Sequence, residues 1–542
     1  MPGLRKTKHI FAYLEILPST CDISDPETLS KIYSLYAKAI SNIDALRNVF
    51  PNPSFSVKFF ANYLIFADEV VSHPDEDNDD LVAHNPQRSL LALWYFVSYF
   101  QYQALLEYGW LIRGAVTCGS LYLTGNRNDR QDQQTGQDQM NTIDFVWGGA
   151  LVRGYSLQKE EPYPRIIIDT EVSQYMEREF PQQLPIFQYS ITDEELEHPK
   201  SVNYAATYNW TKSQRLAEVS NNAILEKVRN LIEQCDDNNL RGMYEWTRSY
   251  LQDVRGMGVS HISPNDPEEI PAPSPTTNPE LESYYIAYLD FLGAERKIQD
   301  EDSATESHEK EKWLNAIADI YEQSLIYLRN LDSPIRSLFY SGDISVQVKT
   351  KIFSDNVIIA IKVSERVDEV LSASSQLSAL VSYFQTYALL KYRWLLRGCI
   401  TKGQLYMDDI FVWGPAVLRT SHLENTMAKN PRILIDIEEF DRISTDLILF
   451  EHLYPQEDPD DEMWFVGYQQ IISLGAEFMS ITSDNPFMNS NGFLGACHDV
   501  LTEMFDEYRD TPVRDKVLWA IKYHNRVCRE EGENSLIISL GE

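Results

Sequence analysis

The chain has 542 residues, a net charge of −34 at neutral pH, and 43% hydrophobic and 12% aromatic side chains. This length exceeds what one hydrophobic core organises, and the apolar content excludes an intrinsically disordered protein. The acidic balance excludes a surface that coats nucleic acid, because such a surface needs stripes of lysine and arginine.

The six cysteines are scattered without CxxC spacing, so the sequence predicts neither a disulfide framework nor a zinc site. The beginning of the chain lacks the apolar stretch of a secretory signal, and polar side chains interrupt the most apolar segment, 90–112. We therefore expect a soluble cytoplasmic protein with no membrane span.

The sequence contains one domain twice. Residues 98–123 and 382–407 are identical at 16 of 26 positions, and shorter matches flank this pair in the same order. A segment rich in proline and acidic residues, 261–283, predicts an extended linker between the copies. The expected domains are therefore 1–260 and 284–542.

The residue pattern of the second copy predicts the element order β-α-β-β-α-β-α-β. The expected elements are a strand over 284–292, a helix over 307–331, paired strands within 337–363, a helix over 371–392, a strand over 394–401, a helix through 424 and a strand over 432–436. This order is typical of an α+β sheet with helices on one face. The first copy adds a polar run, 124–140, that predicts a flexible hairpin loop.

Five motifs follow this order in the second copy: YLDFLG, FSDN, LLRGCITKG, VWGPA and SHLE. Together they resemble class III nucleotidyl cyclases, and most closely a diverged bacterial, cyclase-like group. The resemblance implies two ferredoxin-like, palm-type domains that form an intramolecular pseudo-dimer. One domain would hold the metals and the other would supply transition-state groups. It also implies a nucleoside triphosphate as substrate and Mg²⁺ or Mn²⁺ as cofactor.

The resemblance places the two metal-binding aspartates at Asp290, where the first strand ends, and at Asp355, at the turn of the hairpin. Divalent ions need such carboxylates converging from neighbouring strands, although an aspartate at a strand end also serves simply as a turn residue. In the first copy the corresponding residues are Glu15 and Asp68. Glutamate carries its carboxylate about one methylene further, so we expect a degenerate metal site there.

Three arginines are candidate catalytic residues: Arg153, Arg419 and Arg397. A guanidinium neutralises charge that develops on a transferring phosphoryl group. For Arg397 the alternative is a structural ion pair with a carboxylate. The resemblance implies an asparagine and an arginine on the helix after the VWG motif, but Val152 and Ser156 occupy those positions in the first copy.

The candidate nucleotide-binding residues are Lys351, Phe145 and Trp147. Lys351 stands four residues before Asp355, at the position of the purine-reading lysine, and its expected counterpart in the first copy is Leu64. Phe145 stands where the resemblance implies a base-selecting acid, two residues before the tryptophan.

Three functions remain open from the sequence. The first is a metal-dependent nucleotidyl cyclase, or a related second-messenger synthase, with one composite inter-domain site; the resemblance suggests anti-phage defence as its setting. The second is a catalytically inactive cyclase-like protein that senses a nucleotide or docks a protein partner. The third is a palm-type oligonucleotide synthase.

Overall fold

A computed structural model describes the chain in fifteen segments: residues 7–22, 25–45, 55–71, 86–123, 143–179, 188–189, 201–205, 214–255, 279–292, 312–330, 348–353, 356–363, 367–436, 455–476 and 492–540. The predicted hairpin loop at 124–140 and most of the predicted linker lie outside these segments.

The two halves contain the same succession of elements. In the first half these are β1 (Thr7–Ile16), α1 (Pro26–Ala45), β2 (Phe55–Phe60), β3 (Tyr63–Val71), α2 (Pro86–Gln103), β4 (Ile112–Leu123), β5 (Ile143–Trp147), α3 (Gly149–Glu160) and β6 (Ile166–Ile168). In the second half they are β9 (Glu282–Phe291), α11 (Lys312–Asn330), β10 (Val348–Phe353), β11 (Asn356–Lys362), α13 (Val367–Tyr392), β12 (Leu396–Met407), β13 (Phe411–Trp413), α14 (Pro415–Met427) and β14 (Ile433–Ile435). The predicted α+β class is confirmed, and β13 is a strand that the prediction counted only as the lead into a helix.

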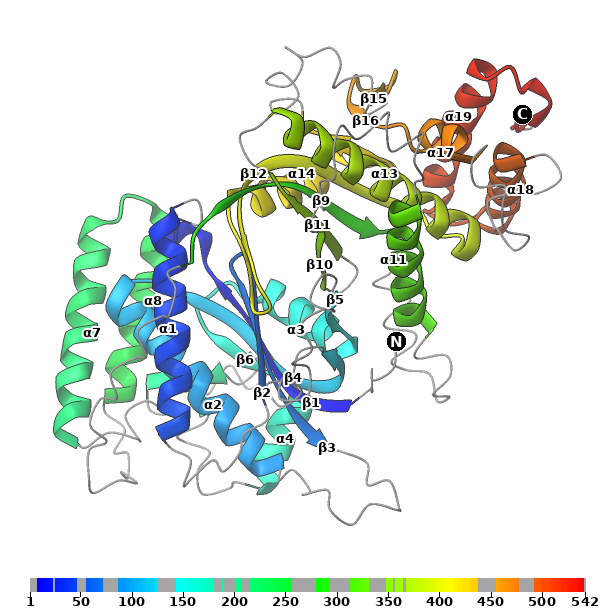
Figure 1. Ribbon diagram of the computed structural model, residues 1–542. Coiled ribbons are helices and arrows are strands. Elements are labelled where there is room, and N and C mark those ends of the chain that lie inside the picture. Colours follow the sequence, from blue (N-terminus) through cyan, green and yellow to red (C-terminus); the bar gives the residue numbers. More distant parts are fainter. Residues whose placement is uncertain are drawn as a thin grey trace, which may run out of the picture.

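Each half ends in its own additional elements (Figure 1). The first half continues with α4 (Thr170–Glu179), β7 (Gln188–Tyr189), β8 (Ser201–Val202) and the packed pair α7 (Gln214–Gln234) and α8 (Asn238–Arg255). The second half continues with β15 (Pro455–Glu457), β16 (Trp464–Val466), α17 (Tyr468–Ala476), α18 (Gly492–Glu507) and α19 (Arg514–Glu530). No helix in the described segments is both long and apolar enough to span a membrane.

The sheets form because their strands are apolar on both faces. In β9 the eight residues from Tyr284 to Phe291 are all buried, and one face of the strand packs on α11 and α13. The corresponding helix of the first half, α2, passes into a short π-helical turn and ends at Gly109, whose φ of +74° is the left-handed conformation that commonly stops a helix. Arg393 follows α13 with a φ of +57° at the corresponding point.

The described strands join the two halves. Within each half the order is β4-β1-β3-β2 or β12-β9-β11-β10. Strand β13 leaves the second half and pairs in parallel with β2, while β5 leaves the first half and pairs in parallel with β10. Because β13 also pairs with β12 and β5 with β4, the strands form a closed ring. The β2–β3 hairpin and the β10–β11 hairpin meet at its centre. Phe60 and Phe353 stack there with ring centroids 4.8 Å apart.

Glycine allows the central strands to approach closely beside the candidate site. A Cβ on Gly398 of β12 would lie 2.3 Å from the carbonyl oxygen of Tyr288, and one on Gly114 would lie 2.3 Å from that of Tyr13. We predict that Gly398→Ala destabilises the protein by about 1–3 kcal/mol, because the backbone of β9 must move to admit a methyl group.

The matched control is Gly242→Ala in α8, where an added Cβ meets no atom within 4 Å. Alanine is favoured over glycine inside a helix, so this change should stabilise the protein by about 0.5–1 kcal/mol. Urea unfolding of both variants measures the difference. Equal urea midpoints of unfolding for the two variants would show that β9 and β12 leave room for a methyl group at Gly398.

Candidate functional site

An acidic side chain stands near the end of the first strand in each half, beside an arginine of the neighbouring strand. Asp290 in β9 is the register partner of Arg397 in β12, and Glu15 in β1 is the partner of Arg113 in β4. The arginine Nε donates to the carboxylate at 2.7 Å in the second half and at 2.6 Å in the first. Arg397, predicted as a catalytic residue, is therefore engaged by Asp290.

The strand register corrects one predicted correspondence. Asp290 is opposite Asn356 and Glu15 is opposite Tyr63, so the residue that matches Asp355 is Asn62 and not Asp68. Asp68 is opposite Ile10, five residues further along β3 and about 17 Å from the row that contains Glu15. The predicted correspondence of Asp68 with Asp355 is therefore wrong.

The same register shows that Lys58, and not Leu64, is the counterpart of Lys351. The prediction failed because the letters IFAD at 65–68 resemble IFSD at 352–355, although the first run lies in the second strand of its hairpin and the other spans the turn. An alignment of KFFANYLIFA at 58–67 with KIFSDNVIIA at 351–360 keeps both turns in register.

In the first half, hydrogen-bond donors surround the carboxylate. Asn62 Nδ2 donates to Glu15 Oε1 at 3.2 Å, while Gln158 of α3 and Arg113 donate to Glu15 Oε2. One arginine balances the one negative charge, and two amides supply further donors. This donor set does not fit a divalent cation, which needs oxygen ligands and a second carboxylate.

In the second half, two carboxylates share one arginine. Arg397 Nε lies 2.7 Å from Asp290 Oδ2 and 2.8 Å from Glu424 Oε1, and Glu424 of α14 occupies the position of Gln158. Glu424 is 2% exposed and Asp290 is 8% exposed. Asp355 lies outside the described residues, but its neighbour Asn356 is the register partner of Asp290.

The second half fits a divalent cation better than the first, since carboxylates replace both amides. Within the described segments alone, no group of three or more His, Cys, Asp or Glu side chains is placed to hold a metal ion. The cation site of Asp290 with Asp355 therefore stays a prediction, because Asp355 lies outside the described residues. The sequence did not single out Glu424 as a neighbour of Arg397 and Asp290; the signal was a glutamate in the second copy where the first has Gln158.

The paired helix arginines each bind an aspartate of their own half. Arg419 forms a two-pronged ion pair with Asp436, and its Nη2 donates to Oδ1 at 2.7 Å. Arg153 is 45% exposed and reaches Asp169 only at 3.3 Å. Burial tends to lower the pKa of Arg153, but the carboxylates of Asp169 and Glu171 together raise it. Arg153 also reaches Glu171 at 3.4 Å, so its two contacts are longer than the ion pair of Arg419.

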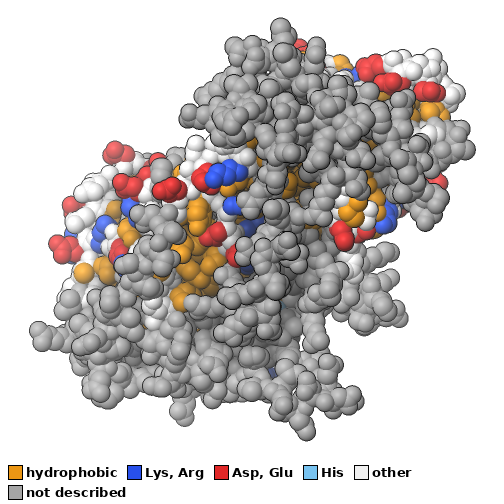
Figure 2. Space-filling model, viewed as in Figure 1, with side chains coloured by type: hydrophobic (Ala, Val, Ile, Leu, Met, Phe, Trp, Pro, Cys, Tyr) orange, Lys and Arg blue, Asp and Glu red, His pale blue; other side chains and the backbone are white. Residues whose placement is uncertain are grey.

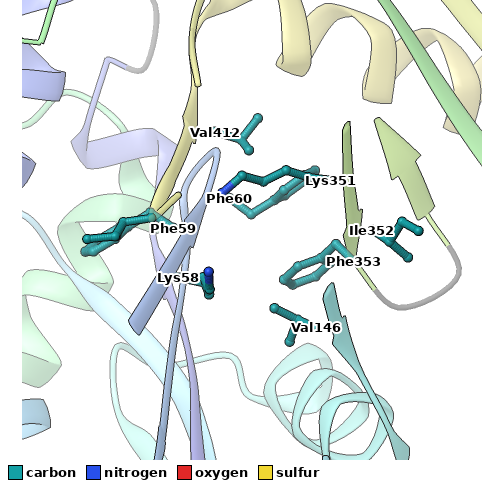
Figure 3. A pocket seen from close by; sticks show the side chains of 9 residues that line it. Lys58, Phe59, Phe60, Val146, Lys351, Ile352, Phe353 and Val412 are labelled. Atoms are coloured by element: carbon teal, nitrogen blue, oxygen red, sulfur yellow. The ribbon is translucent and has the colours of Figure 1, made fainter. Parts of the chain in front are cut away.

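A narrow cleft lies where the two β-hairpins meet. Lys58, Phe59 and Phe60 line it from the first half, and Lys351 and Phe353 line it from the second (Figure 3). Lys58 Nζ donates to the carbonyl oxygen of Asp409 at 2.7 Å, so it ties β2 to the segment before β13. The space in this cleft, about 20 Å³, is large enough for one water molecule and too small for a purine.

The remaining predicted residues lie in β5 and α3. The side chains of Phe145 and Trp147 are outside the described residues, but their counterparts Phe411 and Trp413 are fully buried in the first half's core. Phe411 stacks on Phe59 with ring centroids 4.5 Å apart. Val152, at the position where the resemblance implies asparagine, is buried among residues of the second half.

Known proteins resemble the chain only remotely. No protein-family model matches it, and no curated protein matches it in sequence. A solved structure described as a class III adenylyl cyclase-like ATP-binding protein from Pseudomonas aeruginosa aligns with 81% of this chain and 85% of its own, with 11% identity and a TM-score of 0.39. At this level the likeness assigns no function to the chain.

Proposed function

We propose that the protein is a metal-dependent nucleotidyl cyclase, or a related second-messenger synthase, with one composite site. The carboxylates would come from the second half and the facing helix, α3, from the first. The observation that carries this proposal is the exchange of two amides for two carboxylates between equivalent positions. Asn62 and Gln158 donate to Glu15, whereas in the aligned sequence of the second copy these two positions are Asp355 and Glu424.

Cyclisation joins the ribose 3′-oxygen to the α-phosphorus, releases pyrophosphate and removes the 3′-hydroxyl proton. A bound divalent cation would neutralise the phosphates and lower the pKa of that hydroxyl. Asp290 and Asp355 would hold this cation. Arg153, which is 45% exposed on α3, would neutralise charge on the phosphoryl group from the opposite half.

The internal pseudo-dimer is part of this proposal. The parallel pairing of β5 with β10 joins the halves next to the β10–β11 hairpin, and Val152 of α3 packs in the second half's core. Lys351 and Lys58 line one cleft between the halves. We propose that Lys351, which the resemblance places at the purine-reading position, contacts the base.

A second candidate is a catalytically silent protein that senses a nucleotide. Two observations favour it: Arg397 already neutralises Asp290, and the buried Val152 offers no hydrogen bond to a ribose or phosphate where the resemblance implies asparagine. In this case the nucleotide would bind without turnover.

The test is to incubate the purified protein with Mn²⁺ or Mg²⁺ and each nucleoside triphosphate, and to resolve the products by mass spectrometry. A cyclic product that disappears in Asp290→Ala supports the first candidate. Nucleotide binding without any product, unaffected by Asp290→Ala, would overturn it in favour of the second.

A further inference from the structure

One face of helix α3 is directed towards the second half. The opposite face packs on the sheet of the first half, where a Cβ on Gly154 would lie 2.9 Å from Phe11 Cε1. Val152 is instead buried among residues of the second half's core. Side chains four or seven positions apart lie on the same face of a helix. Ser156 and Lys159 therefore continue the face that begins with Val152.

Lys159 is the basic side chain of this face, and no carboxylate among the described residues forms an ion pair with it. Its Nζ lies 5.7 Å from the centroid of the Tyr155 ring, and that ring is 40% exposed. Such a contact steadies an ammonium group without neutralising its charge. The other cation of α3, Arg153, already has Asp169 and Glu171 as partners. Lys159 is therefore the more available of the two for an anionic ligand.

We propose that Lys159 contacts the phosphate groups of a nucleoside triphosphate bound between the halves. Long side chains of a helix lean towards the preceding turn, so Lys159 extends to the level of Ser156, where the resemblance implies an arginine. The lysine would supply from one turn further along the positive charge that the serine lacks. This inference rests on the proposed function, because it concerns the nucleotide of the same composite site. It requires a bound triphosphate and no particular ligand of a cation.

The corresponding helix of the second half lacks this arrangement. Ser421 and Asn425 of α14 stand at the positions of Tyr155 and Lys159. Asn425 Nδ2 donates to the carbonyl oxygen of Ser421 at 2.9 Å, so a neutral contact within the helix replaces the lysine and the aromatic ring. An anionic ligand would find a cation on α3 and none at the equivalent place on α14. This difference agrees with a single composite site that uses α3.

Lys159→Met and its control Lys522→Met test this role in the full-length protein. The probes are the β,γ-imido analogues of ATP and GTP with saturating Mg²⁺, and calorimetric titration measures their affinity. Lys159→Met should weaken binding by about 10-fold or more, the usual effect of losing one charge-assisted hydrogen bond. Lys522 of α19 is 64% exposed, and its replacement should leave the affinity unchanged. Addition of Ser156→Arg to Lys159→Met should restore binding, because an arginine there returns the charge to the same level of the helix.

Three results would overturn the inference: unchanged affinity in Lys159→Met, a loss that Ser156→Arg does not restore, or no binding of either analogue by the unmodified protein. Product formation judges the proposed function separately. If Lys159→Met weakens binding but the unmodified protein forms no product from ATP or GTP, the phosphate contact stands and the cyclase proposal fails. If product forms and Lys159→Met binds the analogues normally, the reverse holds.

Discussion

Asp290→Asn should reduce product formation by at least about 100-fold while leaving the fold intact. Asparagine removes the charge that the cation needs and keeps the size of the side chain. The fold should tolerate the change because Arg397 retains Glu424, 2.8 Å from its Nε. Mass spectrometry measures the product, and the melting temperature without metal reports the fold.

Glu15→Gln is the control, and we expect it to behave in the opposite way. Arg113 has Glu15 as its carboxylate partner, and Asn62 and Gln158 also donate to that carboxylate. The variant should lose stability while its rate of product formation stays close to that of the unmodified protein. An equal loss of product in both variants would contradict the proposed asymmetry, because it would mean that both halves hold a working cation.

Arg432→Met should destabilise the protein by about 3–5 kcal/mol, the usual cost of leaving a buried charge without its partner. Arg432 is fully buried and forms ion pairs with Asp458 and Asp461. Asp458 is 2% exposed, and it also accepts a hydrogen bond from Trp519 Nε1 at 2.8 Å. Removal of the guanidinium leaves this carboxylate without its compensating charge.

The destabilisation caused by Arg432→Met should also affect the candidate site. The carbonyl oxygen of Arg432 accepts a hydrogen bond from the backbone N–H of Gly398 at 3.1 Å, and Gly398 follows Arg397 directly. The control is Asp461→Asn, whose side chain is 40% exposed; exposed ion pairs contribute about 0–1 kcal/mol. Denaturant unfolding measures both variants. Similar small losses would show that solvent reaches Asp458 and that the ion pair is not buried.

Acidic side chains remain abundant on the surface, as the net charge of −34 predicts. Figure 2 shows Asp and Glu side chains at the left and upper right edges of the visible face, and a few beside the hydrophobic side chains near its centre. The net charge therefore correctly indicated an acidic, solvated surface. It gave no indication of the candidate site, where one arginine lies between two carboxylates.

The periodicity of the chain predicted most of the secondary structure, since buried strands such as β9 and long apolar helices such as α13 have distinct patterns. The resemblance and the repeat, and not the periodicity, placed an acid at the end of each first strand. The periodicity could not place the hairpin register, because Asp68 and Asp355 follow similar letters in different strands. Register depends on which residues pair across strands, and that information is not local.

The ion-pair partners of the arginines also could not be predicted from the sequence. Arg153 and Arg419 occupy matching positions, yet one is loosely paired and the other binds its aspartate with two prongs. Glu424 lies 27 residues from Arg397 in the chain, and only the packing of α14 on β12 brings them together. The difference between Gln158 and Glu424 is visible in the sequence, but it becomes informative only when the strand register shows which residues surround each of them.

The number of Mn²⁺–nucleotide complexes bound per chain tests the central claim most directly. Isothermal titration calorimetry with a non-hydrolysable nucleoside triphosphate and saturating Mn²⁺ should give one site per chain, lost in Asp290→Asn and retained in Glu15→Gln. Two equivalent sites, or one site that is lost in Glu15→Gln and retained in Asp290→Asn, would contradict the assignment of the working site to the carboxylates of the second half.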